Sequence, residues 1–173
     1  WSKQYVDSET ENIDSMNCLI DWLPKNLPSE KRTGIVHGDY SLTNVMIGKN
    51  DPNVIAILDW ELSTLGDPCA DFNYHCLQYI MNPKLADKDY CRNQGIPVID
   101  EYVKMYSEKI NVDLTEEWDL YSAYNLFKLA GILQGILGRV RDGTAAHENA
   151  AERASGVKNL SDKAWDLVKK NFL

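Results

Sequence analysis

Residues 37–44 have the sequence His37-Gly38-Asp39-Tyr40-Ser41-Leu42-Thr43-Asn44, and together with the pattern that follows they predict the fold of this 173-residue chain. The stretch leads into a short apolar, β-branched segment, 44–47, and a second such segment, 54–58, comes after a turn. The residues between the two segments are rich in turn formers, with Asp51-Pro52 near their centre. This pattern predicts an antiparallel β-hairpin.

The predicted hairpin brings polar side chains together. Asn44 begins its first strand and Asp59 follows its second, so the two residues are expected to lie side by side. Amide and carboxylate oxygens suit Mg²⁺, which completes its shell with water and substrate phosphates. Asp39, earlier in the loop, can accept the proton of an incoming hydroxyl and orient it toward a γ-phosphate. The residues therefore predict a phosphoryl-transfer site, with Asp39 as base and Asn44 and Asp59 as magnesium ligands.

These motifs resemble those of the aminoglycoside and choline kinase-like phosphotransferases, distant relatives of protein kinases. The resemblance rests on His37-Gly38-Asp39 with Asn44, on Leu58-Asp59-Trp60, and on Gly66-Asp67-Pro68 with Asp71. The run 58–68 and the helical segment 129–136 are similar to the branch whose kinase-like domain is fused to, or encoded beside, acyl-CoA dehydrogenases. Gly38 stands where protein kinases usually carry Arg, and Trp60 stands where they carry Phe.

The resemblance implies an α+β, mainly helical fold: the C-terminal lobe of a protein kinase-like enzyme, with a short β-hairpin that carries the catalytic and metal residues. It makes Asp39 the catalytic base and Asn44 and Asp59 the metal ligands, with Mg²⁺ and ATP as cofactors. It also gives two residues supporting roles. His37 would pack under the loop, and Asp71, at the start of a helix, would accept hydrogen bonds from the loop backbone.

The predicted function is ATP-dependent phosphorylation of a hydroxyl group on a small molecule by a magnesium-dependent kinase. The branch resemblance suggests a hydroxyacyl-CoA-like acceptor, and Glu61 is expected at the rim of the acceptor site. Two alternatives stay open. One is a pseudokinase or interaction module without turnover of its own. The other is a metal-dependent hydrolase that uses His37, Asp39 and Asp59, but it leaves the spacing of Asn44 unexplained.

We expect residues 1–173 to form a single domain. A complete member of the resembled family begins with an N-terminal nucleotide lobe, which supplies a phosphate-covering loop, a Lys that grips the phosphates and a Glu that orients the Lys. The 36 residues before His37 show no Gly-rich strand–turn–strand pattern. We therefore expect a covalently linked N-terminal lobe on a longer chain, with natural truncation as the alternative.

Composition limits the classes of partner. With 44% hydrophobic and 25% charged residues, the chain can bury a core. A net charge of −8 argues against nucleic acid or an anionic membrane as the main partner, and no apolar run approaches the ~20 residues of a membrane span. The four cysteines show neither a disulfide framework nor metal-type spacing. We expect a cytoplasmic protein with reduced thiols, and an organellar targeting peptide stays open.

Apolar spacing predicts a mainly helical body around the hairpin. A short strand is expected at 34–36, a loop at 61–67, and a partly irregular polar segment at 82–95. Gly131, Gly135 and Gly138 lie within a helical apolar pattern, so they predict close helix packing rather than a nucleotide-binding loop. Helices are expected over 11–26, from Pro68 through about 77, over 97–109, over 115–141 and over 146–170.

Overall fold

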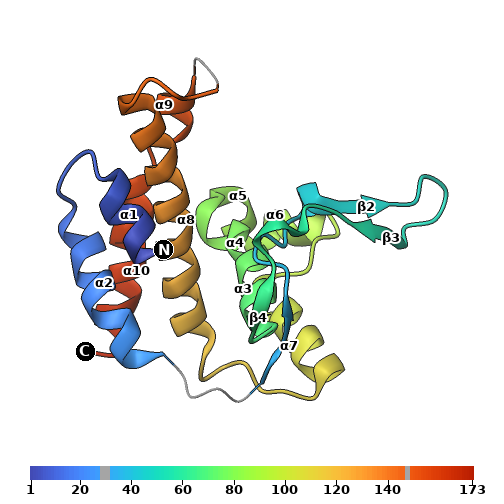
Figure 1. Cartoon of the computed structure of the whole chain (residues 1–173). Coiled ribbons are helices and arrows are strands. Elements are labelled where there is room, and N and C mark those ends of the chain that lie inside the picture. The colour runs from blue at the N-terminus through green and yellow to red at the C-terminus, as the bar shows by residue number, and fades with distance from the viewer. Residues whose placement is uncertain (28–31, 147–148) are drawn as a thin grey trace. The chain divides into compact units, whose positions relative to one another are not determined.

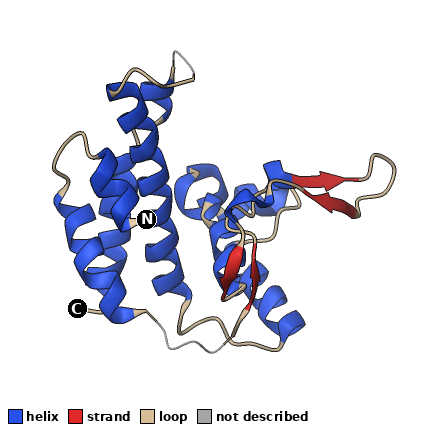
Figure 2. Cartoon of the chain, in the orientation of Figure 1, coloured by secondary structure: helices blue, strands red, loops and turns tan. Residues whose placement is uncertain are grey.

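The structure, a computed structural model, describes residues 1–27, 32–146 and 149–173. It divides into two compact units, one made of Trp1–Leu27 with Asp119–Leu173 and the other of Pro28–Trp118. Helices dominate, and the strands form two separate antiparallel pairs (Figures 1 and 2). The predicted mainly helical fold with a small amount of sheet is confirmed. Within the described residues, no helix is long and apolar enough to cross a membrane.

The first unit is built from helices. Its elements are α1 (Ser2–Ser8), α2 (Asp14–Asn26), nearly all of α8 (Trp118–Arg141), α9 (Ala150–Arg153) and α10 (Val157–Asn171). Helices α2 and α10 pack against each other (Figure 1). A buried polar contact links the two helices, because the Ser15 hydroxyl donates to the Asp162 carboxylate and lies 2.8 Å from Ser161 Oγ.

Helix α1 packs against a row of glycines on α8, here called the glycine stripe, which consists of Gly131, Gly135 and Gly138. A Cβ on Gly138 would lie 2.7 Å from Ser8 Cβ, and one on Gly135 would lie 3.0 Å from the side-chain nitrogen of Gln4. One residue before Gly135, the fully buried Gln134 donates to the Ser8 carbonyl oxygen at 2.7 Å. The close packing predicted for the glycines is therefore confirmed at the end of the stripe that meets Ser8.

Alanine substitutions at the two ends of this stripe should change the stability of the protein in opposite directions. Gly138→Ala is expected to destabilise the protein by about 1–3 kcal/mol, because the new methyl overlaps Ser8. Gly131→Ala is the matched control, since its Cβ would meet Trp1 only at 3.9 Å and alanine favours a helix over glycine by up to about 1 kcal/mol. Urea unfolding of both variants checks the pair, and equal losses at the two positions would contradict this packing.

The second unit combines the two strand pairs with short helices. The elements up to β4 are β1 (Gly34–Val36), η1 (Leu42–Asn44), β2 (Val45–Ile47), β3 (Val54–Ile57), η2 (Trp60–Leu62) and β4 (Thr64–Gly66). They are followed by α3 (Cys69–Cys76), α4 (Gln78–Met81), α5 (Pro83–Ala86), α6 (Lys88–Asn93) and α7 (Ile99–Ile110). Strand β2 pairs with β3 and strand β1 with β4. An aromatic cluster joins α3 to α7, with the rings of Phe72 and Tyr106 stacked at 3.8 Å.

The structure confirms the hairpin, the strand at 34–36 and the helix that opens after Pro68, and it corrects other expectations. Part of the predicted 61–67 loop forms β4, which pairs with β1. The 82–95 segment contains two short helices, capped by the side chains of Asn82 and Asp87. The predicted last helix is interrupted at 154–156, and residues 147–148 near its expected start lie outside the described residues. The single-domain expectation stays a prediction.

Candidate functional site

Asp71, in the first turn of α3, holds the start of the 37–44 loop. One oxygen of its carboxylate accepts the Gly38 N–H at 2.9 Å, and the other accepts the His37 N–H. Hydrogen bonds to a charged group are stronger than neutral ones, and two consecutive amides that share one carboxylate fix the local backbone. The side chain of Asp71 therefore sets the path by which the loop leaves β1.

His37 lies beneath the loop and uses both of its ring nitrogens. The residue is only 2% exposed. Its Nε2 donates to the Leu58 carbonyl oxygen at 2.7 Å, and its Nδ1 accepts the Asp39 N–H at 3.2 Å. The Trp60 ring covers the imidazole, with the two centroids 4.7 Å apart. This arrangement requires the neutral ring with its proton on Nε2, and it ties the loop to the end of the hairpin.

Gly38 is required by the backbone conformation of the loop. Its φ is +86°, in the region that side chains disfavour, and a Cβ here would lie 2.4 Å from the Leu62 carbonyl oxygen. The close approach brings the loop against η2. Any larger residue at this position would have to displace the segment that follows Asp59.

Asn44 connects Asp39 to the hairpin. Its Nδ2 donates to the Asp39 carbonyl oxygen at 2.9 Å and to the Asp39 carboxylate at 3.0 Å. Its backbone carbonyl accepts the Leu58 N–H at 2.8 Å, which extends the register in which Val45 pairs with Ile57. Asp59, the next residue, has the left-handed conformation φ 65°, ψ 58°, which turns the chain out of β3. The predicted approach of Asn44 to the Asp59 end of the hairpin is thus present in the backbone.

The donor set at this corner fits a magnesium ion. Because both hydrogens of the Asn44 amide bond to Asp39, the amide oxygen is the end of that side chain that remains for a cation. Asp59 is exposed, and it follows Leu58, the residue whose N–H bonds to the Asn44 carbonyl, so its carboxylate is offered beside Asn44. Two oxygen ligands suffice for a cation that keeps several waters and takes phosphate oxygens. Glu61 is also exposed, on η2.

Tyr74 lies on α3, within the helix predicted to open at Pro68, and Asp39 acts on it. Burial, followed by the influence of Asp39, raises the pKa of Tyr74 above its ordinary value. A signal was available, because Tyr74 lies three residues after Asp71 and so on the same face of α3. Such a position is more often occupied by a core residue, and the spacing alone did not distinguish the two.

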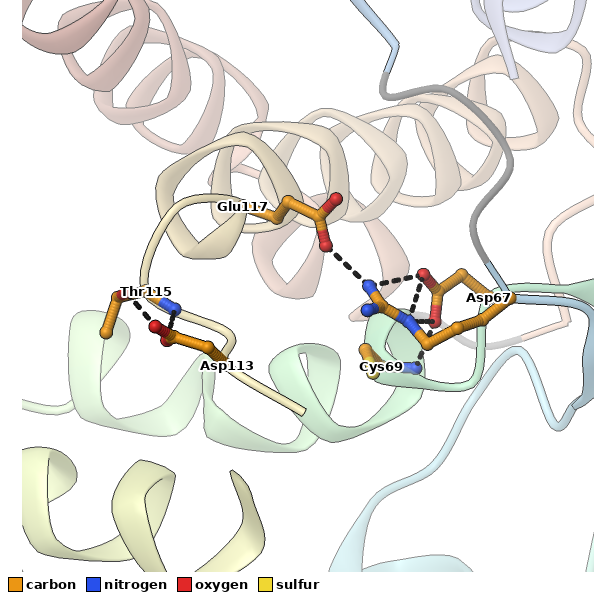
Figure 3. Close-up of polar contacts among 6 residues, drawn as sticks. Asp67, Cys69, Asp113, Thr115 and Glu117 are labelled. Carbon is orange, nitrogen blue, oxygen red and sulfur yellow. Dashed lines mark hydrogen bonds and ion pairs between the residues drawn. The ribbon is translucent and has the colours of Figure 1, made fainter. Parts of the chain in front are cut away.

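An ion network fixes the segment between the hairpin and α3 (Figure 3). The Asp67 carboxylate accepts the Cys69 N–H at 2.9 Å and pairs with the Arg32 guanidinium at 2.8 Å. The same guanidinium also bonds to the mostly buried Glu117, which lies just before α8. The pKa of the Cys69 thiol is raised to about 12, first by burial and then by Asp67, so this cysteine stays protonated. The network anchors both ends of the second unit to the start of α3.

Residues 1–124 match the model of the phosphotransferase enzyme family known as APH. The chain belongs to this family. The family resemblance recognised in the sequence is confirmed, and membership supports a kinase-like function.

Two relatives of this chain are longer proteins. Acyl-CoA dehydrogenase family member 10 of Mus musculus is 39% identical over 175 residues, which cover 98% of this chain and 16% of that protein. Acyl-CoA dehydrogenase family member 11 of Homo sapiens is 33% identical over 177 residues, covering 99% of this chain and 23% of that protein. The chain therefore spans less than a quarter of either relative. The predicted resemblance to the branch associated with acyl-CoA dehydrogenases is confirmed.

A solved structure shares the fold. The crystal structure of a putative aminoglycoside phosphotransferase from Ralstonia eutropha aligns with a TM-score of 0.90 at 42% identity, over 100% of this chain and 54% of that chain. The phosphotransferase fold predicted from the sequence is thus confirmed across the described residues.

The two hydrogen bonds that Asp71 accepts from the His37 and Gly38 N–H groups, here called the Asp71 clamp, should stabilise the loop. In Asp71→Asn one carboxylate oxygen becomes an amide donor that faces a backbone N–H, so we expect a loss of about 2 kcal/mol in the free energy of unfolding. Asp89→Asn, at an exposed carboxylate in the first turn of α6, is the control and should change stability by less than about 0.5 kcal/mol. Urea denaturation measures both, and a loss no larger in Asp71→Asn than in Asp89→Asn would argue against the clamp.

Proposed function

We propose that this phosphotransferase moves the γ-phosphoryl group of ATP to a hydroxyl of a small molecule, with Asp39 as the catalytic base. The observation that carries the proposal is the position of Asn44. The Asn44 side chain donates to the Asp39 carboxylate, and the Asn44 backbone carbonyl accepts the N–H of Leu58, the residue before Asp59. A base and two oxygen ligands at one corner are what in-line phosphoryl transfer requires of a protein.

Each residue of the chain has a distinct task in this proposal. The acceptor hydroxyl approaches Asp39, which takes its proton as the oxygen attacks the γ-phosphorus and ADP leaves. Asn44, through its amide oxygen, and Asp59, through its carboxylate, would hold Mg²⁺, which when bound neutralises charge on the phosphates. His37 and Asp71 support the loop, because their hydrogen bonds run to backbone groups of the loop and of the hairpin end.

The acceptor class is a further part of the proposal. Similarity to two proteins named as acyl-CoA dehydrogenase family members favours a hydroxylated acyl-CoA over an aminoglycoside or an amino alcohol. Glu61, exposed two residues after Asp59, is proposed for the rim of the acceptor site. We also propose that an N-terminal nucleotide lobe on the same polypeptide supplies the remaining phosphate contacts, and that the enzyme is cytoplasmic.

Magnesium-dependent nucleotide binding tests the metal site. In the full-length protein encoded by the gene, Asp59→Ala should weaken Mg·ATP binding by at least about tenfold, because a carboxylate ligand is lost. Asp51→Ala, at the exposed turn of the same hairpin, is the matched control and should bind as the wild type does. Titration calorimetry with and without Mg²⁺ measures both. Nucleotide binding that ignores Mg²⁺ and is unchanged in Asp59→Ala would refute the metal assignment.

The acceptor is tested by following ADP release over three classes of compound: hydroxylated acyl-CoAs, amino alcohols and aminoglycosides. We expect turnover with the first class and its loss, by about 10²-fold or more, in Asp39→Asn. Turnover confined to aminoglycosides would overturn the acceptor class and leave the base assignment standing. Nucleotide binding without ADP release for any compound would favour the interaction module.

A further inference from the structure

Asp59 has a backbone conformation that residues with a side chain disfavour. Its φ of 65° and ψ of 58° lie in the left-handed region, where a Cβ crowds the backbone. Among the residues that the structure describes, Asn111 is the other non-glycine residue with a positive φ, and it ends α7, where helices commonly adopt this conformation. Asp59 instead follows a strand, so contacts around it must hold its conformation.

Two hydrogen bonds fix the residue before Asp59. The Leu58 N–H donates to the Asn44 carbonyl oxygen at 2.8 Å, and the Leu58 carbonyl oxygen accepts from His37 Nε2 at 2.7 Å. The Asp59 side chain is exposed, so the direction in which its carboxylate points depends mainly on the backbone that carries it. A turn that is held on one side only would leave that direction loosely defined.

The side chain of Trp60 holds the other side of the turn. Trp60 Nε1 donates to the Ile57 carbonyl oxygen at 2.9 Å, so this hydrogen bond spans from the last residue of β3 to the first residue of η2. The Trp60 ring also lies against the His37 imidazole, with the centroids 4.7 Å apart. Leu58 and Asp59 are therefore enclosed in a loop that the indole N–H closes.

A phenylalanine could not close this loop. Phe is the residue that protein kinases usually carry at the position of Trp60, and a phenyl ring can cover His37 but has no N–H group to donate. The indole thus combines two functions, ring packing against His37 and hydrogen bonding across the turn. The substitution Trp60→Phe removes the second function and retains an aromatic ring for the first.

We propose that Trp60 is a positioning residue, whose indole N–H holds the turn in which Asp59 presents its carboxylate to magnesium. The inference rests on the proposed function, because that function makes Asp59 a magnesium ligand. The indole N–H donates only, so Trp60 acts through Asp59. Without this hydrogen bond, Asp59 spends less time in the left-handed conformation, and the apparent affinity for Mg·ATP falls in proportion.

Binding of ATP to the full-length protein encoded by the gene, measured by titration calorimetry with and without Mg²⁺, tests the proposal. Trp60→Phe should weaken Mg·ATP binding about fivefold, the ratio that corresponds to one typical net hydrogen bond, and should leave the binding of metal-free ATP within about twofold. A general loss of structure would weaken both.

Trp22→Phe is the matched control for this substitution. It makes the same exchange of an indole for a phenyl ring on α2, where the Trp22 ring contacts Phe172 at a centroid distance of 5.4 Å. The Trp22→Phe variant should bind Mg·ATP as the wild type does.

A double-mutant cycle tests whether Trp60 acts through Asp59. If it does, adding Trp60→Phe to Asp59→Ala should change Mg·ATP binding by less than about twofold. The inference is overturned by wild-type Mg·ATP binding in Trp60→Phe, by an equal loss in Trp22→Phe, by an equal loss in the absence of Mg²⁺, or by an undiminished loss in the Asp59→Ala background.

The same measurements distinguish this inference from the function on which it rests. Wild-type Mg·ATP binding in Asp59→Ala, or no ATP binding by the wild-type protein, would overturn the proposed metal site and the role of Trp60 with it. Weakened binding in Asp59→Ala together with wild-type binding in Trp60→Phe would overturn only the positioning role.

Discussion

Two backbone N–H groups that converge on the Asp71 carboxylate are the contact on which the candidate site depends. They fix His37 and Gly38 where the chain leaves β1, and the other contacts follow from that path. His37 then reaches the Leu58 carbonyl, and Asn44 spans from Asp39 to the hairpin. Because these links share members, the loop and the hairpin end form one connected set of hydrogen bonds. Such sets are worth more together than the sum of their single bonds.

The hairpin could be predicted because its signals are local. Two β-branched segments and a turn around Asp51-Pro52 determine the pairing, and the pairing places Asn44 near Asp59 without further information. The roles expected for His37 and Asp71 came from family resemblance. The observed bonds are those that such roles would require, although the catalytic assignments stay predictions.

Other elements have no periodic signal. Strand β4 has three residues and forms only because β1 lies beside it, and the helices α5 and α6 depend on single capping side chains, Asn82 and Asp87. Arg32 bonds to Asp67 and to Glu117, which lie 35 and 85 residues away in the sequence. No local pattern predicts an ion pair over such separations. Tyr74 was missed for a different reason, because a half-buried aromatic on a helix resembles a core residue.

Gly38 carries a consequence for control of the enzyme. Protein kinases usually have Arg at the corresponding position, and phosphorylation can order their activation loops through arginine–phosphate pairs. Here the Leu62 carbonyl oxygen and a φ of +86° exclude any side chain from the position. The segment that follows Asp59 therefore rests directly against the loop backbone, where no cation at residue 38 could capture a phosphate. Phosphorylation of that segment would have no arginine here through which to switch the enzyme on.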